Sequence, residues 1–384
     1  MPVFFSMQHP ENFSSEFSPY FISNIDFGGA NKIGQLKAFS RIIYSVEAKR
    51  KIKRLVEQER PDIAHLHNIY HQISPSILDV LDEHSIPSVM TLHDYKLTCP
   101  AYTLLSMGSV CEECRDGKYY KVAQHKCTKQ SFLKSSLSAI EMYIHHYLLH
   151  VYNKVKVFIS PSAFLKSKIW EMGFRGEVVH LPNFIDSTRF TPAFNNDGRT
   201  FIYLGRLSVE KGLLTLLKAA GELKGRFNLK IIGDGPLRED LVAYARDNKL
   251  SNVEFLGYLH ADAIKKEVSK AVFTVVPSEW YENNPMSIIE SFALGKPVIG
   301  ARIGGIPELV KDQETGLTFE PGSCSDLADK ISQLIQNQKL VFDMGQNARL
   351  HVEQRLNPQV HYQVLMEIYR RAQQRTQEKS KTTA

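Results

Sequence analysis

The sequence contains no stretch that approaches the roughly 20 apolar residues needed to span a bilayer. Its N-terminus also lacks a basic segment followed by an apolar run and a cleavage site. Cysteine is scarce, with five residues in 384, which favours reduced thiols or a metal site over a disulfide framework. These absences predict a cytoplasmic protein, with the inner face of the membrane as the alternative location.

No large block of like charge is present. The net charge is +6, but acids and bases are interspersed except for a basic cluster at 49–54 on a predicted helix. No stacking aromatic residues are interleaved with this cluster, so it is typical of a solvated helix face and does not predict nucleic-acid binding. A loose attraction to anionic lipid head groups stays open. The 23% of charged residues, with 17 prolines and 22 glycines, excludes disordered and fibrous classes.

Length and pattern predict two α/β domains. A chain of 384 residues with 43% hydrophobic residues is too long for one ordinary core. Apolar runs of strand length alternate with amphipathic stretches of helix length, which predicts parallel sheets with helices on both faces. Two such domains imply a cleft between them. Strands are expected at 63–66, 88–92, 155–159, 200–204, 229–232, 253–256, 273–276 and 297–300.

The domain boundary is predicted near residue 190. Residues 191–199 gather Pro, Asn, Asp and Gly without apolar periodicity, which is typical of a hinge. We expect an N-terminal domain over 1–190 and a C-terminal domain over 191–357. A helix and a frayed polar tail follow over 358–384, and a return of this helix to the N-terminal domain is one option.

A further helix is predicted over 131–152, with an apolar stripe along one face. The stripe favours packing in the core or between the domains, and membrane docking is the alternative. Its residues are Leu133, Leu137, Ile140, Tyr143, Ile144, Tyr147 and Leu148.

Glycine turns follow several strands of the second half. After the strand at 200–204, Gly205 and Arg206 open a loop that reaches Lys211 before a helix. A strand, a glycine turn and a helix start present backbone N–H groups to an anion, and the two cations add positive charge. This arrangement suits a diphosphate.

Two similar turns border the same predicted sheet edge. Gly233 and Asp234 follow the strand at 229–232 and let the backbone approach a ligand, although a tight turn without a ligand is the alternative. Gly304 and Gly305 follow the strand at 297–300 in the same way.

The segment ENNPMSIIE at 282–290 carries two carboxylates eight positions apart. If Pro285 lies in the first turn of a helix, Glu282 lies in the loop before it and Glu290 more than one turn inside. The two carboxylates can then serve different parts of one extended ligand. Glu290 can accept hydrogen bonds from a ribose diol, while the helix N-terminus faces phosphate and Glu282 reaches a sugar.

These motifs resemble the donor half of glycosyltransferase family 4. The resemblance rests on GRLSVEKG at 205–212, IIGDGP at 231–236, ENNPMSIIE and GGIPELV at 304–310, and extends more loosely to PNFID at 182–186 and the His93–Asp94 pair. It implies a GT-B fold, in which two Rossmann-like domains face each other across a cleft. It also implies transfer of a sugar from a nucleoside-diphosphate sugar with retention of anomeric configuration and without a required metal.

Carried over by position, the resemblance implies a catalytic set of Glu282, His93, Arg206 and Lys211. Arg206 and Lys211 would hold the donor diphosphate and stabilise the charge that grows on it as it leaves. Glu290 would hold the ribose, Glu282 would contact hydroxyls of the sugar, and His93 would line the sugar site from the N-terminal domain. The remaining donor-binding residues would be Gly205, Gly233, Asp234, Asn284, Pro285, Met286, Gly304 and Gly305.

The family's usual work predicts a glycan or lipid-linked acceptor, in surface polysaccharide or glycoconjugate synthesis, on the side of the N-terminal domain. A catalytically silent nucleotide-sugar binding subunit and a GT-B nucleotide-sugar epimerase are the alternatives, although the EKG and paired-Glu motifs disfavour the epimerase. Peripheral membrane association stays open, and no nucleic-acid partner is expected.

The start of the chain departs from the family pattern. Family members usually begin with an apolar strand and a glycine-rich loop, whereas residues 2–6 already fit the second strand, and Gly28 and Gly29 follow too late in the order. We therefore expect an N-terminal domain without its first strand and glycine-rich loop, through a misassigned start site or a shortened chain. Such a gap bears on catalysis, because that loop approaches donor and acceptor.

Four of the five cysteines lie in one irregular segment, as a CxxC pair flanked by single cysteines at 11 and 12 intervening residues. Four thiolates at such spacing can enclose a structural Zn²⁺, with His125 as a substitute ligand and free thiols as the alternative. The four are Cys99, Cys111, Cys114 and Cys127.

Histidines and tyrosines gather near the same region. Three histidines follow or end a strand at the sheet edge of His93, namely His65, His67 and His71. Hydrogen bonds from these histidines to the backbone are the favoured interpretation, and contacts with an acceptor are the alternative. Stacking on an acceptor sugar and ordinary packing both stay open for Tyr95, Tyr102, Tyr119 and Tyr120.

Overall fold

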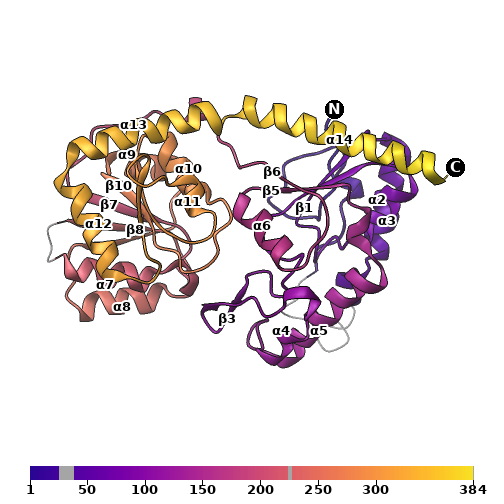
Figure 1. The fold of residues 1–384 in the computed structure, drawn as a ribbon, viewed down its shortest axis with the longest axis horizontal. Coiled ribbons are helices and arrows are strands. Elements are labelled where there is room, and N and C mark those ends of the chain that lie inside the picture. Colours follow the sequence, from indigo (N-terminus) through magenta and orange to yellow (C-terminus); the bar gives the residue numbers. More distant parts are fainter. Residues whose placement is uncertain (26–38, 224–226, 384) are drawn as a thin grey trace.

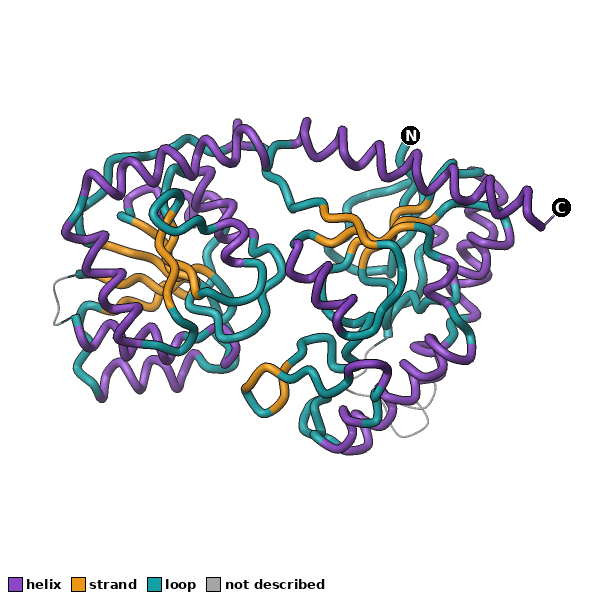
Figure 2. Tube along the Cα trace, in the orientation of Figure 1, coloured by secondary structure: helices purple, strands orange, loops and turns teal. Residues whose placement is uncertain are grey.

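The computed structural model describes residues 1–25, 39–223 and 227–383, which form two α/β domains, each built on a parallel sheet (Figure 1). The N-terminal sheet has the order β1-β2-β5-β6, and the six-stranded C-terminal sheet has the order β12-β11-β10-β7-β8-β9. Helices cover both sheets, and the strands lie inside each domain (Figure 2). The prediction of two α/β domains with parallel sheets is confirmed.

The main elements of the N-terminal domain are α2 (Val46–Glu59), β1 (Ala64–His67), α3 (Ile77–Glu83), β2 (Ser88–Thr91), β3 (Leu105–Ser106), β4 (Ser109–Val110), α4 (Lys121–Gln124), α5 (Phe132–Tyr143), β5 (Val157–Ser160), α6 (Ala163–Glu171) and β6 (Val178–His180). Those of the C-terminal domain are β7 (Thr200–Leu204), α7 (Leu213–Glu222), β8 (Asn228–Ile232), α8 (Arg238–Asp247), β9 (Val253–Gly257), α9 (Ala261–Lys270), β10 (Phe273–Val276), α10 (Met286–Ala293), β11 (Val298–Ala301), α11 (Ile306–Leu309), β12 (Gly316–Phe319), α12 (Cys324–Gln336), α13 (Gln338–Arg355) and α14 (Pro358–Thr383).

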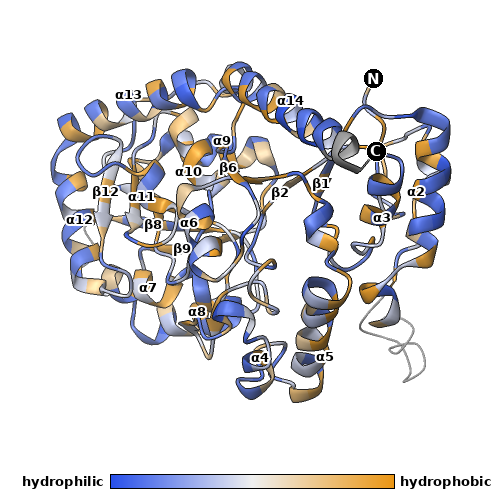
Figure 3. Ribbon diagram, turned by 45° about the vertical axis from the view of Figure 1, so that its right-hand side comes forward, coloured by the Kyte–Doolittle hydropathy of each residue, from blue (hydrophilic) through white to orange (hydrophobic). Residues whose placement is uncertain are grey.

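All eight predicted strands form, each within two residues of its expected start. Strands β10, β11 and β12 are buried along their whole length, as expected of parallel strands with helices on both faces. Outer helices such as α13 alternate hydrophobic and hydrophilic residues (Figure 3), because one face packs inward and the other meets solvent.

The prediction of a strand over residues 2–6 is wrong. That segment forms no strand, and the isolated bridge between Met7 and Ile22 lies just after it. Phe17, Phe21 and Ile22 are instead buried in the core that also contains α2 and α3. Gly28 and Gly29 lie outside the described residues.

The connection between the domains lies earlier than predicted. Ile185 already belongs to the core of the C-terminal domain, and its N–H donates to the carbonyl of Leu356 at 2.9 Å. The segment expected to be a hinge, 191–199, is bound to that domain, since the N–H of Ala193 donates to the carbonyl of Leu294 at 2.9 Å.

Helix α14 returns to the N-terminal domain, the option that the sequence left open. It runs across the top of that domain in Figure 1, and its Ile368 and Ala372 pack with Val89, Val157 and Ile159 of β2 and β5. The tail expected to fray is helical to Thr383. Arg371 and Arg375 stabilise it, because each lies 2.6 Å from the carboxylate of Glu177.

The apolar stripe of the predicted helix 131–152 is largely exposed, so the expected core packing is wrong for much of it. Leu133, Ile140, Tyr147 and Leu148 are 46–72% exposed, while α5 buries Ser135, Ala139 and Met142. The helix also ends at Tyr143 and continues as a π-helical turn over Ile144–Leu148, which changes the face that each later residue presents. In the described part of the chain, no helix has the length and apolar character of a membrane span.

Candidate active site

Glycine turns lie together at the carboxyl ends of β7, β8 and β11. A Cβ at Gly233 would lie 1.9 Å from the carbonyl oxygen of Gly205, and a Cβ at Gly304 would lie 2.4 Å from that of Glu282. Only glycine allows these backbones to approach so closely. The structure therefore brings the turns of Gly205, Gly233 and Gly304 to one edge of the sheet.

Lys211 and Glu282, predicted to hold diphosphate and sugar, are in direct contact. The Nζ of Lys211 lies 2.6 Å from Oε1 of Glu282, and the hydroxyl of Ser278 donates to the same oxygen at 2.6 Å. The Glu282 side chain is 8% exposed, and Lys211 lies over the ring of Trp280 at 5.0 Å. Glu282 is largely shielded from water and Lys211 partly so, which strengthens the Coulomb attraction between them relative to an exposed pair.

Arg206 has different surroundings. Its side chain is exposed, and no ion pair to it is found within the described residues. The hydroxyl of Tyr203 donates to the carbonyl of Arg206 at 2.7 Å, which holds the loop against the end of β7. Arg206 is therefore a cation available to a ligand at the same edge. Asp234, in the neighbouring turn, is exposed as well.

The ENNPMSIIE segment has the predicted shape, with a one-residue difference. Helix α10 begins at Met286, so Pro285 is its N-cap instead of part of its first turn. Glu290 lies inside the helix and lines a cavity of about 100 Å³ with Leu204, Ile264 and Lys265. Burial raises the pKa of Glu290, and the charge of Lys265 opposes this effect.

Asn283 and Asn284 join the two domains. The amide of Asn283 donates to the carbonyl of Leu92 at 3.1 Å, next to His93, and its oxygen accepts from Ser162 at 2.8 Å. The oxygen of Asn284, expected to bind the donor, accepts the backbone N–H of Asn183 at 3.1 Å. The motif therefore holds the end of β2 beside the sheet edge that carries the glycine turns.

Glu308 adds a second contact between the domains, for which the sequence had suggested no role. Its carboxylate accepts the backbone N–H groups of Ala163 at 2.8 Å and Phe164 at 2.6 Å. These are the first two residues of α6, where the helix dipole favours a negative charge.

The histidines of the N-terminal edge bond to side chains, so the expected backbone hydrogen bonds are wrong for His65 and His67. The Nδ1 of His67 lies 2.9 Å from Nε2 of His93. His65 lies 2.8 Å from the hydroxyl of Tyr369 and 2.7 Å from that of Thr91. His71 stands apart, with its ring 6.4 Å from Tyr102.

The four tyrosines divide by exposure. Tyr95 and Tyr119 are buried, and the Tyr95 hydroxyl donates to the carbonyl of Tyr281 at 3.1 Å, so packing accounts for both. Tyr102 and Tyr120 are each 47% exposed and stay available to an acceptor.

The four cysteines lie near one another as free thiols. Cys99 and Cys114 are buried, and Cys111 and Cys127 are half-buried. The pKa of Cys114 is raised mainly by burial and further by the charges that the three neighbouring thiols would carry. As they stand, no three His, Cys, Asp or Glu side chains in the described ranges form a group that could hold a metal. Zinc binding would require the thiols to come closer together than they are in this structure.

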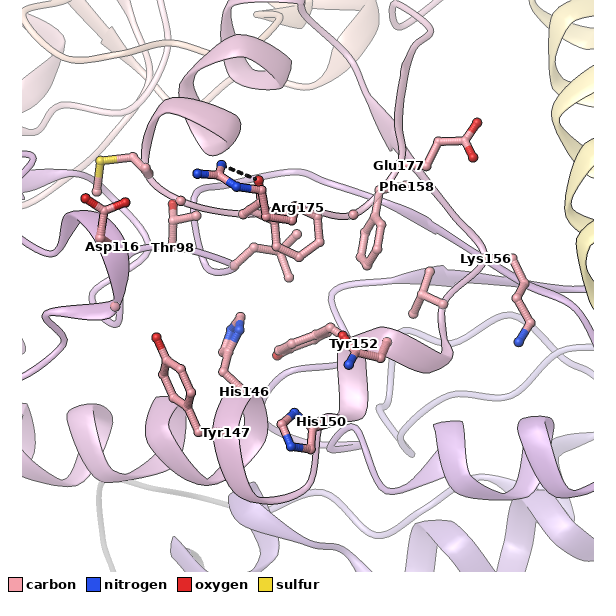
Figure 4. A pocket seen from close by; sticks show the side chains of 18 of the residues that line it. Thr98, Asp116, His146, Tyr147, His150, Tyr152, Lys156, Phe158, Arg175 and Glu177 are labelled. Carbon is pink, nitrogen blue, oxygen red and sulfur yellow. Dashed lines mark hydrogen bonds between the residues drawn. The ribbon is translucent and has the colours of Figure 1, made fainter. Parts of the chain in front are cut away.

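A larger cavity of about 830 Å³ lies elsewhere in the N-terminal domain (Figure 4). Lys156 and Glu177, which line it, precede β5 and β6, whereas His93 follows β2, so the cavity is at the opposite edge of the sheet. Much of its charge is paired: Lys156 with Asp82, and Arg371 and Arg375 with Glu177. None of the predicted donor residues lines it.

Comparisons with known proteins agree with this geometry. Residues 31–189 match the model of Glycosyltransferase Family 4, and residues 184–351 match that of Glycosyl transferases group 1. An uncharacterised glycosyltransferase of Methanocaldococcus jannaschii is 27% identical over 320 residues, which is 83% of this chain and 78% of that protein.

Solved structures show the same fold. Sucrose-phosphate synthase from Thermosynechococcus elongatus matches 95% of this chain and 87% of its own, with a TM-score of 0.68 and 19% identity. Anabaena HepE in complex with UDP and glucose matches 91% of this chain and 84% of its own, with a TM-score of 0.61 and 19% identity. With two Rossmann-like domains, and with family matches that together cover both, the chain belongs to glycosyltransferase family 4 and is a transferase of the GT-B fold.

Proposed function

We propose that this glycosyltransferase takes its sugar from a nucleoside-diphosphate sugar and passes it to a glycan or lipid-linked acceptor with retention of configuration. The observation that carries the proposal is the alignment of Arg206, Lys211, Glu282 and Glu290 along one sheet edge, joined through Asn283 to the strand end that bears His93. The UDP and glucose bound by Anabaena HepE, which shares the fold, support the same donor class.

The diphosphate would lie between the Gly205 turn and the N-terminus of α10. Arg206 is exposed there, while Lys211 is already paired with Glu282. An arriving diphosphate would compete with the Glu282 carboxylate for Lys211. Such an exchange would free Glu282 to accept hydrogen bonds from the sugar hydroxyls at the moment when the donor is bound.

The nucleoside would lie at the cavity of Glu290. A half-buried carboxylate beside apolar walls suits a ribose diol, because it accepts two hydrogen bonds while the base contacts Leu204 and Ile264.

In the reaction, the bond from the anomeric carbon to the diphosphate oxygen breaks, and the acceptor oxygen bonds to the same carbon. The leaving phosphate oxygen takes the acceptor proton on the same face, so no separate base is required. Arg206, Lys211 and the N–H groups of α10 would stabilise the charge that grows on the leaving group. We expect no metal ion in this step.

A donor screen tests the proposal. The purified chain is incubated with UDP-, GDP- and ADP-sugars, and thermal shift and slow hydrolysis of each are measured beside the Glu290→Ala variant. We expect one nucleotide class to stabilise the wild type more than the variant and to be hydrolysed. Stabilisation without turnover of any donor would support the silent binding subunit, and a changed sugar in the recovered nucleotide would support the epimerase.

The exposed apolar face of α5 supports a second part of the proposal, contact with the inner face of a membrane in the cytoplasm. Phe132 and Leu133 are 62% and 68% exposed, and Lys129 and Lys134 beside them are exposed as well. Apolar residues flanked by lysines suit an anionic lipid surface. We expect sedimentation with phosphatidylglycerol vesicles, reduced by Phe132→Ser with Leu133→Ser. No sedimentation of the wild type would contradict this part alone.

A further inference from the structure

We propose that His67 is a positioning residue for His93, holding its imidazole so that a single ring nitrogen faces the sugar site. The inference rests on the proposed function only in placing His93 at that site. It concerns the pair formed by the last residue of β1 and the second residue after β2, which the sequence had placed at one sheet edge without predicting a contact between them.

The parallel sheet brings the two rings together. His67 is opposite Thr91 in the pairing of β1 with β2, so His93 follows two residues beyond it at the same edge. The 2.9 Å between Nδ1 of His67 and Nε2 of His93 is a hydrogen-bond distance, and only one of these two nitrogens can carry the hydrogen. Nε2 of His93 is thereby occupied, which leaves Nδ1 as its nitrogen for a ligand.

His67 is itself held in place. Its ring stacks on His65, with centroids 4.4 Å apart and an angle of 29° between the ring planes. Both nitrogens of His65 are engaged, one by Tyr369 of α14 and the other by Thr91 of β2. A series of fixed contacts therefore runs from the C-terminal helix through His65 and His67 to His93.

The neutral form of the pair is favoured. Both side chains are partly exposed, but desolvation on the packed side of the ring lowers the pKa of His67, and the charge that His93 would carry lowers it further. Burial also lowers the pKa of His93. Near neutral pH both rings are then uncharged, and one donates to the other, as in the hydrogen-bonded partners that fix the tautomer of functional histidines.

A simple packing role for His67 makes a different prediction. The side-chain amide of asparagine lies where Nδ1 of histidine lies, and it can donate or accept. Leucine fills similar space without a polar atom. If His67 positions His93, His67→Asn should preserve the positioning of His93 and His67→Leu should lose it. If His67 only packs, leucine should do as well as asparagine or better.

The first measurement needs no ligand. In protein labelled with ¹⁵N-histidine, two-bond ¹H–¹⁵N spectra report the tautomer of each histidine. The signals of His93 are identified as those that disappear in His93→Ala. We expect a single neutral tautomer in the wild type and in His67→Asn, and a mixture in His67→Leu. One unchanged tautomer in all three proteins would overturn the proposal.

The second measurement is hydrolysis of UDP-glucose, or of whichever of UDP-, GDP- and ADP-glucose the wild type hydrolyses fastest. We expect kcat of His67→Leu to fall about 10-fold to 100-fold, by analogy with the loss of the hydrogen-bond partner of a metal-bound histidine, with KM little changed. His67→Asn should stay within about 3-fold of the wild type by the same reasoning. Equal kcat in His67→Leu and His67→Asn would overturn the proposal.

His84→Leu is the matched control, since His84 precedes β2 at the opposite edge of the sheet and should leave kcat unchanged. His93→Ala separates the two levels of inference. Full activity of His93→Ala would reject the proposed sugar site, whereas an inactive His93→Ala beside a fully active His67→Leu would reject the positioning role alone.

Discussion

Lys211 and Arg206 were expected to bind one diphosphate, yet their surroundings differ. Lys211 is paired with a carboxylate that is 8% exposed, while Arg206 reaches solvent without an ion pair among the described residues. The sequence places both in one loop but cannot show which carboxylate comes close to which cation. That contact depends on Glu282, 71 positions further along the chain.

We therefore predict different effects for the two alanine variants. Arg206→Ala should lower turnover about 10²-fold, because it removes the positive charge that would stabilise the leaving diphosphate. It should leave the free energy of unfolding nearly unchanged. Lys211→Ala should lower turnover similarly and also lower the free energy of unfolding, because it leaves Glu282 buried without its cation. Kinetics and thermal unfolding measure both effects.

Arg246→Ala provides the matched control, since Arg246 is a highly exposed arginine on α8 of the same domain. Turnover within a few-fold of wild type in both Arg206→Ala and Lys211→Ala would contradict the diphosphate site. An unchanged melting temperature in Lys211→Ala would contradict the buried ion pair alone.

At the scale of elements, strands were easier to predict than connections. The fully buried strands of the C-terminal domain are short apolar runs, and this pattern identifies them without any tertiary contact. Strand β6 was missed because it has only three residues, and β12 because Gly316 and Thr318 interrupt its apolar character.

Connections depend on packing that composition does not reveal. Residues 191–199 have the composition of a hinge, but backbone bonds attach them to the C-terminal domain. The apolar stripe of α5 has helical spacing, but spacing alone does not tell a core from an exposed face. The glycine turns and paired carboxylates were found because each follows a strand at a fixed sheet edge. The contacts of Asn283, Glu308 and His67 cross between elements and left no local pattern.

The cysteine segment carries the element-scale prediction, one zinc per chain held by Cys99, Cys111, Cys114 and Cys127. The other three thiols lie near enough to Cys114 to raise its pKa, but the described residues form no metal-binding group as they stand, so zinc binding would require the segment to rearrange. Elemental analysis of protein purified without chelator should give about one equivalent, because four thiolates close a tetrahedral site. Chelation should loosen the segment 99–127 without changing donor binding.

The cysteine variants sharpen this test. Cys114→Ser should lose the metal, whereas Cys324→Ser, outside the segment, should keep it. Less than about a tenth of an equivalent in the wild type, with all four thiols freely titratable, would contradict a four-thiolate site. Loss of donor binding on chelation, with the fold intact, would place the metal in the reaction.

For the whole molecule, the decisive feature is how two separately built domains stay aligned. Helix α14 crosses from one to the other, and Asn283, Asn284 and Glu308 of the C-terminal domain bond directly to the N-terminal domain. The same loops that border the donor edge therefore also set its distance from His93. If the donor binds at this edge as proposed, donor binding and domain alignment are coupled through the loops that carry these contacts.

Glu308 allows this coupling to be tested without touching the donor residues. Its two carboxylate oxygens accept separate N–H groups at the start of α6, where negative charge is favoured. In Glu308→Gln the charge is lost and one of these bonds meets an amide N–H, so the domains should separate more often. We predict donor affinity close to wild type and turnover about 10-fold lower, the loss expected when a contact worth 1–3 kcal/mol biases two states.

Small-angle scattering, calorimetry with the donor, and steady-state kinetics measure the three effects. The radius of gyration should rise in Glu308→Gln and stay unchanged in the control Glu320→Gln, whose side chain is 68% exposed and pairs only with Arg302 in the described part of the chain. Weaker donor binding would assign Glu308 to the donor site itself. If Glu308→Gln has the turnover and scattering of the wild type, the sheet edge and His93 keep their alignment without this carboxylate. Other contacts, chiefly those of Asn283 and α14, would then hold the domains together.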